Sequence, residues 1–409
     1  MLNQSITEKN IKLIGVKTWQ KHSRNKEYDK FILECTVDLG VKLKNDSYQF
    51  DDFNSKEIKS KIIYDFSNGT DELVVKKLND NIRRLFRINP SDRHSIVKQT
   101  VSLMRDAQPI GIIRLDIKNF YESLDRKAVI KFVNDEWLLS YESRVLLREW
   151  DKKLSESGIN GLPRGMSLSS TLSEIRLRRF DQAVRTSNGV FYYARYVDDI
   201  IVFFTGDSSK LFDLLCETLK SKSPELKFNN KTKVIELREN DNENKELDYL
   251  GYKIIAKSGT HLDGRRRLVR VLISDKKISK IKNRVRRCFT AYTRDRNFNL
   301  LLSRLRFLSA NQYIIGDIER TKLKSGIYYN YPLINERNQL WELDKFYQTL
   351  ISTKAEPIAK AIQMIHRHGG PLNNRRIQQI SKISFIFGFN SRVMNSFSKV
   401  INRKIKRCW

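Results

Sequence analysis

The sequence predicts an α+β protein in which a mixed unit of strands and helices is followed by a helical unit. Residues 112–117 alternate apolar and polar side chains with the period of a strand, and residues 191–204 resemble a hairpin of two strands. After Asp275, apolar residues recur at helical spacing almost to the end of the chain. The boundary between the two units is therefore expected near residue 275.

Helices are expected on both sides of the first strand. The pattern from Leu73 to Arg105 is helical, with a break at residues 89–92, where Asn, Pro, Ser and Asp favour a turn or a new helix start. The other predicted elements are helices at 126–156 and 166–181, a polar linker at 238–246, and strands at Tyr249–Ile255 and Leu268–Ile273.

Charge is the strongest compositional signal. The 409 residues include 77 Lys and Arg against 47 Asp and Glu, which gives a formal net charge of +30, and 40% of residues are hydrophobic. This composition is typical of a folded protein that attracts polyanions, with nucleic acid favoured over a membrane surface. No segment approaches the roughly 18 apolar residues that span a bilayer. We therefore expect a cytoplasmic protein that binds RNA or DNA.

Cysteine and histidine give no sign of a zinc or disulfide site. The cysteines are Cys35, Cys216, Cys288 and Cys408, and none forms a CxxC pair, so reduced thiols are expected. His366 and His368 have the spacing of metal ligands, but no Cys or carboxylate partner is nearby in the sequence, which favours an ordinary helix end.

Three aspartates are the candidate metal ligands. Asp116 lies in the first predicted strand, whereas Asp198 and Asp199 lie in the turn of the predicted hairpin. Two metal ions about 3.5–4 Å apart can join a nucleotide to a growing strand, and magnesium prefers hard oxygen ligands on rigid elements. The alternative for the adjacent pair is an acidic turn without metal, because Asp favours turns.

The sequence around these aspartates resembles the motifs of reverse transcriptases, in the order in which that family carries them. Tyr196-Val197-Asp198-Asp199 resembles the YxDD hairpin, and residues 115–121 resemble the first catalytic-aspartate motif. Three more segments match in order: 161–170 resembles the LPQG…SP segment, 230–232 the lysine-bearing motif, and 247–252 the FLG-type primer-grip strand. Five ordered motifs between residues 110 and 255 are a specific signal, although single short motifs are not.

This resemblance implies an RNA-directed DNA polymerase with a right-hand fold. Residues 1–70 would form an N-terminal extension with part of the fingers, and residues 71–275 would form the fingers and palm, an antiparallel sheet with helices. Residues 276–409 would form an all-helical, basic thumb and C-terminal region. The implied partners are an RNA template, a DNA product and deoxynucleoside triphosphates. The implied cofactor is a pair of Mg²⁺ ions, which Mn²⁺ would be able to replace.

The resemblance also implies a role for each matched residue near the metals. Asp116 and Asp198 would ligate both ions, Asp199 would assist, and the backbone of Ile117 would contact the second ion. Tyr121 would be the steric gate whose ring excludes a ribose 2′-hydroxyl. The alternative for Tyr121 is an ordinary core aromatic.

The remaining implied contacts are with phosphates, bases and the strands. Lys231 would be the acid for the leaving pyrophosphate or a phosphate contact, with a solvated lysine as the alternative. The implied nucleotide contacts are Arg93, Arg164 and Gly165, and the implied nucleic-acid contacts are Tyr196, Leu250, Gly251, Lys276, Lys277, Lys280, Arg284 and Arg287. The last five lie on a predicted thumb helix that would grip the backbone of the duplex.

Two residues depart from the better-known enzymes. Arg164 stands where they have Gln, and Ser170 stands where they have Pro. The Gln shapes the nucleotide pocket, so an Arg there places standard base and sugar selection in doubt, although it would be able to add a phosphate contact.

Two segments instead resemble bacterial abortive-infection and defence-associated reverse transcriptases, which have a retron- and group II intron-like core. They are Arg164-Gly165 with the paired serines that follow, and the run from Asp116 to Leu124. This implies antiphage defence with a dedicated structured noncoding RNA. It also implies a second reverse transcriptase or another copy of this chain as a partner. We expect no ribonuclease H, integrase or endonuclease domain after the helical unit.

Two other functions remain open at this point. The same fold would also serve an untemplated or protein-primed DNA polymerase, and the Arg at position 164 is the observation that suggests this function. A catalytically silent RNA-binding scaffold is the third hypothesis. Three convergent carboxylates repel one another and cost stability, which argues against a scaffold.

Overall fold

The computed structural model describes residues 2–7, 9–11, 13–14, 33–34, 37, 39, 41–42, 45, 47–58, 60–89, 91–238, 243–257, 266–313, 323–352 and 374–409, except for the side chain of Lys399. Cys35, His366 and His368 lie outside these residues. The chain folds as two compact units, of which the first comprises residues 1–96 and 109–238 and the second residues 97–108 and 239–409. The assignment of fingers, palm and thumb to residue ranges remains a prediction.

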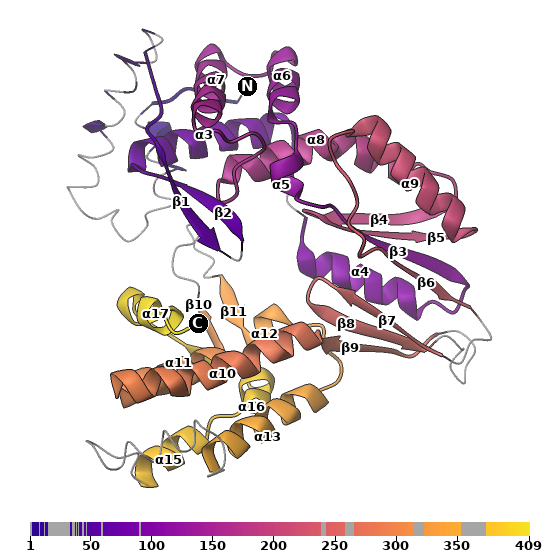
Figure 1. Cartoon of the computed structure of the whole chain (residues 1–409), viewed down its shortest axis with the longest axis vertical. Coiled ribbons are helices and arrows are strands. Elements are labelled where there is room, and N and C mark those ends of the chain that lie inside the picture. Colours follow the sequence, from indigo (N-terminus) through magenta and orange to yellow (C-terminus); the bar gives the residue numbers. More distant parts are fainter. Residues whose placement is uncertain are drawn as a thin grey trace. The chain divides into compact units, whose positions relative to one another are not determined.

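A four-stranded antiparallel sheet lies at the centre of the first unit, with strand order β4-β5-β3-β6 (Figure 1). Its strands are β3 (Ile110–Asp116), β4 (Val190–Tyr196), β5 (Asp199–Phe204) and β6 (Lys233–Leu237). The two inner strands, β3 and β5, are almost entirely buried, as expected of strands that are covered on both faces. The predicted first strand and the predicted hairpin are confirmed.

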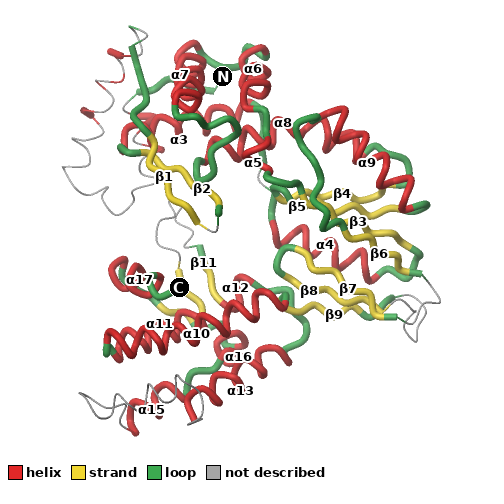
Figure 2. The backbone as a smooth tube through the Cα atoms, viewed as in Figure 1, coloured by secondary structure: helices red, strands yellow, loops and turns green. Residues whose placement is uncertain are grey.

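The helices of the first unit are α3 (Gly69–Leu85), the start of α4 (Arg93–Arg105), α5 (Phe120–Ser123), α6 (Arg126–Asp135), α7 (Tyr141–Glu156), α8 (Ser167–Arg185) and α9 (Ser208–Lys222). Of these helices, α8 and α9 pack on the sheet, whereas α3, α6 and α7 pack on α8 and on one another. A two-stranded hairpin of β1 (Phe53–Ile58) and β2 (Lys61–Phe66) precedes them. The predicted break at residues 89–92 is confirmed, since it separates α3 from α4 (Figure 2).

The helical pattern predicted over residues 126–156 is confirmed except at residues 136–140, which separate α6 from α7. Trp137 adopts a φ of +54°, a conformation that interrupts a right-handed helix. The Ser140 hydroxyl then accepts a hydrogen bond from the backbone N–H of Ser143 at 3.3 Å and so starts α7.

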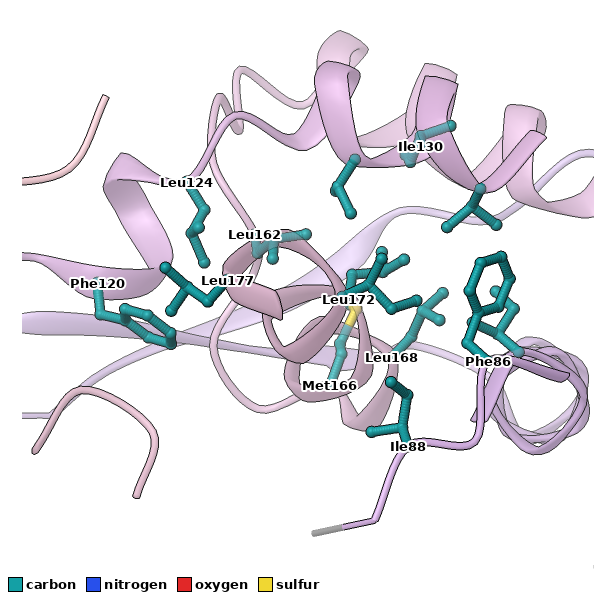
Figure 3. Close-up of a cluster of buried hydrophobic side chains, with 14 of the residues drawn as sticks. Phe86, Ile88, Phe120, Leu124, Ile130, Leu162, Met166, Leu168, Leu172 and Leu177 are labelled. Carbon is teal, nitrogen blue, oxygen red and sulfur yellow. The ribbon is translucent and has the colours of Figure 1, made fainter. Parts of the chain in front are cut away.

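Helix α8 contributes several buried side chains to the hydrophobic core of the first unit. Leu168, Leu172 and Leu177 of this helix are fully buried and cluster with Phe120 and Leu162 (Figure 3). Helices α8 and α9 pack against each other, α8 packs on β4, and α9 packs on β3. The segment that follows β3 and the segment that precedes α8 therefore meet in one apolar cluster.

The second unit combines a three-stranded antiparallel sheet with helices. The sheet has the order β7-β8-β9, with β7 (Asn244–Tyr249), β8 (Tyr252–Lys257) and β9 (Val269–Ile273). The helices are α10 (Asp275–Asp295), α11 (Phe298–Ser309), α12 (Ile327–Asn330), α13 (Asn338–Ser352), α15 (Asn374–Ser381), α16 (Phe385–Asn390) and α17 (Lys399–Lys406). A small second sheet contains β10 (Asn311–Tyr313), β11 (Lys324–Gly326) and β12 (Met394–Asn395).

Three sequence predictions for this unit need correction. The predicted linker at 238–246 already contains the start of β7, and the predicted strand at Tyr249–Ile255 is interrupted by a turn at Leu250 and Gly251. Both turn residues have positive φ, +46° and +84°, which is the pattern of a two-residue type I′ hairpin. The region after Asp275 is also not purely helical, since β10, β11 and β12 lie within it.

The amphipathic pattern predicted after Asp275 is confirmed in α10. Ile278, Val285 and Phe289 are buried, together with Cys288 and Tyr292 on the same face. No described helix of either unit is both long enough and apolar enough to span a lipid bilayer.

A buried ion network ties β4 to α8. The Arg195 side chain, 3% exposed, donates two hydrogen bonds to Asp181 at 2.9 and 2.7 Å and two to Glu174 at 3.1 and 2.7 Å. It also donates to the carbonyl of Val197 at 3.1 Å, and the Tyr193 hydroxyl donates to Asp181 at 2.6 Å. The guanidinium therefore anchors the end of β4 and the turn that follows it to one helix.

We expect Asp181→Ala to lower the free energy of unfolding by about 3–5 kcal/mol, because it leaves a buried guanidinium with an incomplete set of partners. Urea denaturation of the purified protein measures this loss. Glu72→Ala is the matched control, since it removes a half-exposed pair with Lys76 within one helix and is expected to cost at most about 1 kcal/mol. Equal losses for the two variants would show that the network does not anchor the strand.

Candidate active site

Three aspartates from two neighbouring strands converge in the first unit. β3 ends at Asp116, and its antiparallel register places Asp116 opposite Asp199 of β5. The backbone N–H of Ile117 donates to the carbonyl of Asp198 at 3.1 Å, which holds the hairpin turn beside the end of β3. One carboxylate oxygen from each of Asp116, Asp198 and Asp199 lies within 4.8 Å of the other two. This set of hard, partly exposed oxygen donors fits a divalent metal ion.

The turn that carries Asp198 is strained. Tyr196 pairs with Asp199 across a two-residue connection, and Val197, the first residue of that connection, has a φ of +61°. Positive φ at this position alone is the pattern of a type II′ turn, which normally has Gly there. A β-branched residue in this conformation costs on the order of 1–3 kcal/mol, so neighbouring contacts such as the bond from Arg195 to the Val197 carbonyl must hold the turn in place.

Burial and, to a smaller extent, electrostatic repulsion raise the pKa of one carboxyl of the triad. Burial raises the pKa of Asp198 above its ordinary value, and the negative charges of Asp199 and Asp116 raise it further. A divalent cation would relieve both causes, because it restores the solvation lost on burial and screens the like charges.

The other two carboxylates have polar partners that the sequence analysis did not identify. Arg114 donates to an oxygen of Asp199 through Nη2 at 2.7 Å and Nε at 3.3 Å. The side-chain amide of Asn229 donates to Asp116 at 3.0 Å, and its backbone N–H donates to the Asp116 carbonyl at 2.7 Å. Strand periodicity places Arg114 on the face of Asp116 and so gives a signal for it, whereas Asn229 has no local signal.

A second group of predicted residues lies next to the triad. The Tyr121 hydroxyl is hydrogen-bonded to Ser170, and its pKa is raised by burial and by the charge of Asp198. The guanidinium carbon of Arg164 lies 5.1 Å from the centre of the Tyr121 ring. The structure therefore brings the predicted gate and the unusual arginine together with the metal-ligand candidates.

Glu122 fixes the position of Arg164. Its two carboxylate oxygens accept hydrogen bonds from Nε of Arg164 at 2.5 Å and from Nη2 at 2.9 Å. Such a bidentate pair sets the plane of the guanidinium and lowers the pKa of Glu122. Arg164 is thus a positioned group and not a freely moving surface side chain.

Gly165 is required by a close approach of backbone to backbone. It has a φ of +101°, and a Cβ atom there would lie 2.4 Å from the carbonyl oxygen of Tyr64 in β2. The N–H of Tyr64 donates to the Arg164 carbonyl at 2.7 Å, so β2 lies directly along this segment. Gly165, two residues before α8 begins, is therefore held directly against the β1–β2 hairpin.

Other predicted residues of the first unit lie around this group or outside it. Tyr196 ends β4 and pairs with Asp199, and Arg93 begins α4. Lys231 is exposed in the turn before β6 and makes no hydrogen bond or ion pair with the triad among the contacts that the structure describes.

The predicted nucleic-acid contacts of the second unit have mixed exposure. Leu250 and Gly251 form the β7–β8 turn, and α10 exposes Lys276, Lys277, Lys280 and Arg287. Arg284 of the same helix is half-buried, with its guanidinium carbon 5.2 Å from the centre of the Trp409 ring.

We expect Asp198→Asn to raise the melting temperature at pH 7 in EDTA. The pKa of Asp198 is raised by folding, so its charged form is penalised above that pKa, and a neutral amide removes the penalty. The gain should shrink as the pH falls through the raised pKa and disappear below the ordinary aspartate pKa, where the wild-type carboxyl is protonated in both the folded and the unfolded state. Differential scanning fluorimetry from pH 4 to pH 8 checks the direction, and a gain that grows toward acid pH contradicts it.

A substitution at Gly165 tests the contact with β2. Gly165→Ala and Gly158→Ala both place a side chain at positive φ, which costs about 1–2 kcal/mol, but a Cβ at Gly158 meets nothing within 4 Å. We expect Gly165→Ala to be less stable than Gly158→Ala by about 1–3 kcal/mol because of the added collision with Tyr64. Chemical denaturation of both variants measures the difference, and equal stability would exclude a close approach at Gly165.

Comparison with known proteins agrees with this geometry. Residues 69–254 match the family model described as reverse transcriptase (RNA-dependent DNA polymerase), a range that contains the triad, Tyr121, Arg164 and Gly165. No curated protein gives a significant match.

Among solved structures, an apo telomerase from Candida tropicalis, truncated from its C-terminal domain, is 15% identical with a TM-score of 0.33. That similarity covers 45% of this chain and less than half, 43%, of the telomerase chain, so the assignment depends on the domain match alone. Residues 69–254 are therefore a reverse transcriptase domain, that of an RNA-directed DNA polymerase and hence of a nucleotidyltransferase.

Proposed function

We propose that this protein copies RNA into DNA by two-metal nucleotidyl transfer, with Mg²⁺ as the metal. The observation that carries the proposal is the convergence of Asp116, Asp198 and Asp199 within 4.8 Å inside a reverse transcriptase domain. A pair of divalent ions held there would activate a 3′-hydroxyl and stabilise the charge that develops on the triphosphate.

The residues around the triad fit distinct parts of that reaction. Asp116 and Asp198 would hold the ions from the end of β3 and from the hairpin turn, and Asp199 would assist. Arg114 and Asn229 restrict the rotation of Asp199 and Asp116 through the hydrogen bonds described above. The N–H of Ile117 bonds the Asp198 carbonyl, which holds the Ile117 backbone beside the triad, and its carbonyl would contact the second ion.

Selection of the nucleotide would involve Tyr121 and Arg164. The Tyr121 ring, held between Phe120 and the Arg164 guanidinium, fits a steric gate against the ribose 2′-hydroxyl. Arg164 would contact the triphosphate or the template phosphate, and Lys231 and Arg93 would serve the leaving group and the triphosphate. In this proposal residues 71–275 form the fingers and palm, and residues 1–70 form an N-terminal extension with part of the fingers. The basic helix α10, with Lys276, Lys277, Lys280, Arg284 and Arg287, belongs to a thumb.

The biological setting that we propose is bacterial antiphage defence in the cytoplasm, with a dedicated structured noncoding RNA as template. The run from Asp116 to Leu124 and the Arg164-Gly165 pair resemble those of defence-associated enzymes and support this setting. Sequencing the nucleic acid that copurifies with the protein tests it. A single structured RNA supports the proposal, whereas a heterogeneous cellular RNA pool contradicts a dedicated template.

A second candidate is untemplated or protein-primed synthesis on the same fold, and Arg164 favours it. A guanidinium fixed by Glu122 stands where better-known enzymes have an uncharged Gln. Sequencing the DNA product decides between the two. A complement of the bound RNA supports templated synthesis, and a random or homopolymeric product made without RNA supports the second candidate.

We expect Asp116→Asn and Asp198→Asn each to reduce DNA synthesis by at least about 10³-fold, because several kcal/mol of transition-state stabilisation depend on the ions. Primer extension with RNA template, Mg²⁺ and deoxynucleotides measures the loss. Asp213→Asn, an exposed change on α9, is the control.

Mg²⁺ or Mn²⁺ should also raise the melting temperature of wild type more than that of Asp116→Asn. Full activity of both triad variants would exclude the catalytic assignment, and a silent RNA-binding scaffold would show no metal-dependent synthesis in any variant.

A further inference from the structure

An arginine-lined pocket lies within the second unit, where α10, α11 and the end of α17 meet. Its volume is about 520 Å³. One face of α10 forms a wall through Arg287, Thr290, Ala291 and Arg294, and Arg304 of α11 closes another side. Arg407, Cys408 and Trp409 complete the lining. The pocket is thus built from segments that are more than 100 residues apart in the sequence.

The charge of this lining is strongly unbalanced. Four arginines face the pocket, and Asp295 is the single acidic residue among its lining residues. Like charges around one concavity repel one another, and low-dielectric walls concentrate their field. An anion inside the pocket would remove this repulsion.

Arg304 is the most informative residue of the set. Its side chain is only 6% exposed, and Asp295 approaches its Nη1 to 2.7 Å as an ion pair. Its Nε has no hydrogen-bond partner among the residues that the structure describes. Buried guanidinium donors without a partner are costly and uncommon in folded proteins. The other three arginines of the lining, Arg287, Arg294 and Arg407, are exposed and are suited to an oxyanion, because phosphate oxygens accept bidentate hydrogen bonds from arginine.

Trp409 forms part of the pocket wall and is not an open stacking platform. Its ring lies 5.8 Å from that of Phe307, and the Arg284 guanidinium carbon lies 5.2 Å from its centre. These two contacts pack the ring against α11 and α10. Recognition in this pocket would therefore depend on charge and hydrogen bonds to phosphate and not on stacking with a base.

We propose that this pocket binds a terminal phosphate group, carried by a nucleic acid strand or by a nucleotide. A terminal phosphate has more negative charge and more free oxygens than an internal phosphodiester, which matches four arginines opposed by one carboxylate. The proposal concerns residues outside the reverse transcriptase domain and is independent of the polymerase function, so either one can fail without the other.

Cys408 provides a local probe of occupancy. It is half-exposed and lines the pocket, and a hydrogen bond from buried Cys288 lowers its pKa, which favours reaction with alkylating reagents. Inorganic tripolyphosphate should slow alkylation of Cys408 by iodoacetamide at least about fivefold, while Cys216 on α9 reacts at an unchanged rate. Mass spectrometry of the full-length protein in EDTA measures both rates. Equal rates with and without tripolyphosphate at Cys408 would overturn the proposal.

Binding of labelled RNA tests the arginines directly. In EDTA, which suppresses metal-dependent binding of triphosphate at the aspartate triad, RNA with a 5′-triphosphate should bind more tightly than the same RNA with a 5′-hydroxyl. The double variant Arg294→Gln and Arg407→Gln should lose this preference, with binding of the 5′-triphosphate RNA weakened about tenfold or more. Arg306→Gln with Arg403→Gln is the matched control, because it removes the same charge from exposed positions of α11 and α17 outside the pocket.

The probes also separate the two sources of phosphate. A preference for 5′-triphosphate RNA that the pocket variant loses and the control keeps identifies a strand end as ligand. Loss of tripolyphosphate protection in the pocket variant, without any preference between the two RNAs, identifies a free nucleotide or polyphosphate. If the pocket and control variants behave alike with both probes, the pocket does not bind phosphate.

Discussion

The antiparallel pairing of β3 with β5 is the interaction on which the candidate active site depends. It places Asp116 directly opposite Asp199, and the bond from the Ile117 N–H to the Asp198 carbonyl brings the third aspartate alongside. Side chains in a sheet alternate between its faces, so a slip of one residue in this register would move Asp199 to the opposite face from Asp116. Such a slip is costly, because it would move a charged side chain, Asp116 of β3 or Asp199 of β5, from its partly exposed position to the opposite, apolar face.

This arrangement costs free energy that other residues offset. The triad carries like charges at short range, and the turn at Val197 has a backbone conformation that β-branched residues avoid. Arg114 and Asn229 bind two of the carboxylates, while the buried Arg195 anchors the turn to α8. Strain and repulsion at a site that the surrounding fold holds in place are typical of functional sites.

Cations have two different functions in this chain. Arg195 and Arg164 are both bound by carboxylates. Arg195 anchors the hairpin to α8, and Arg164 is oriented beside Tyr121. The arginines of the C-terminal pocket have one carboxylate among them, and the lysines at the start of α10 are exposed. A net charge of +30 therefore describes a sum of neutralised and available cations, and the structure distinguishes them.

The sequence by itself determined the order of the motifs, the three aspartates, the central strand with its hairpin, and the apolar stripe of α10. These features are local, because strand alternation, helical periodicity and short motifs are complete within about a dozen residues. It did not predict the turn at Leu250, the short strands after Asp275 or the break between α6 and α7, where the φ of Trp137 overrides a continuous helical pattern.

Only the tertiary structure decided the partners of the charged groups. Glu122 pairs with Arg164, which lies 42 positions later in the sequence, and Asn229 bonds Asp116 across 113 positions. Arg304 shares its pocket with Arg407, which lies 103 positions later. No local pattern encodes such contacts, since they follow from how sheets and helices pack. The aspartates were thus readable from sequence, whereas the environment that sets their charge and geometry was not.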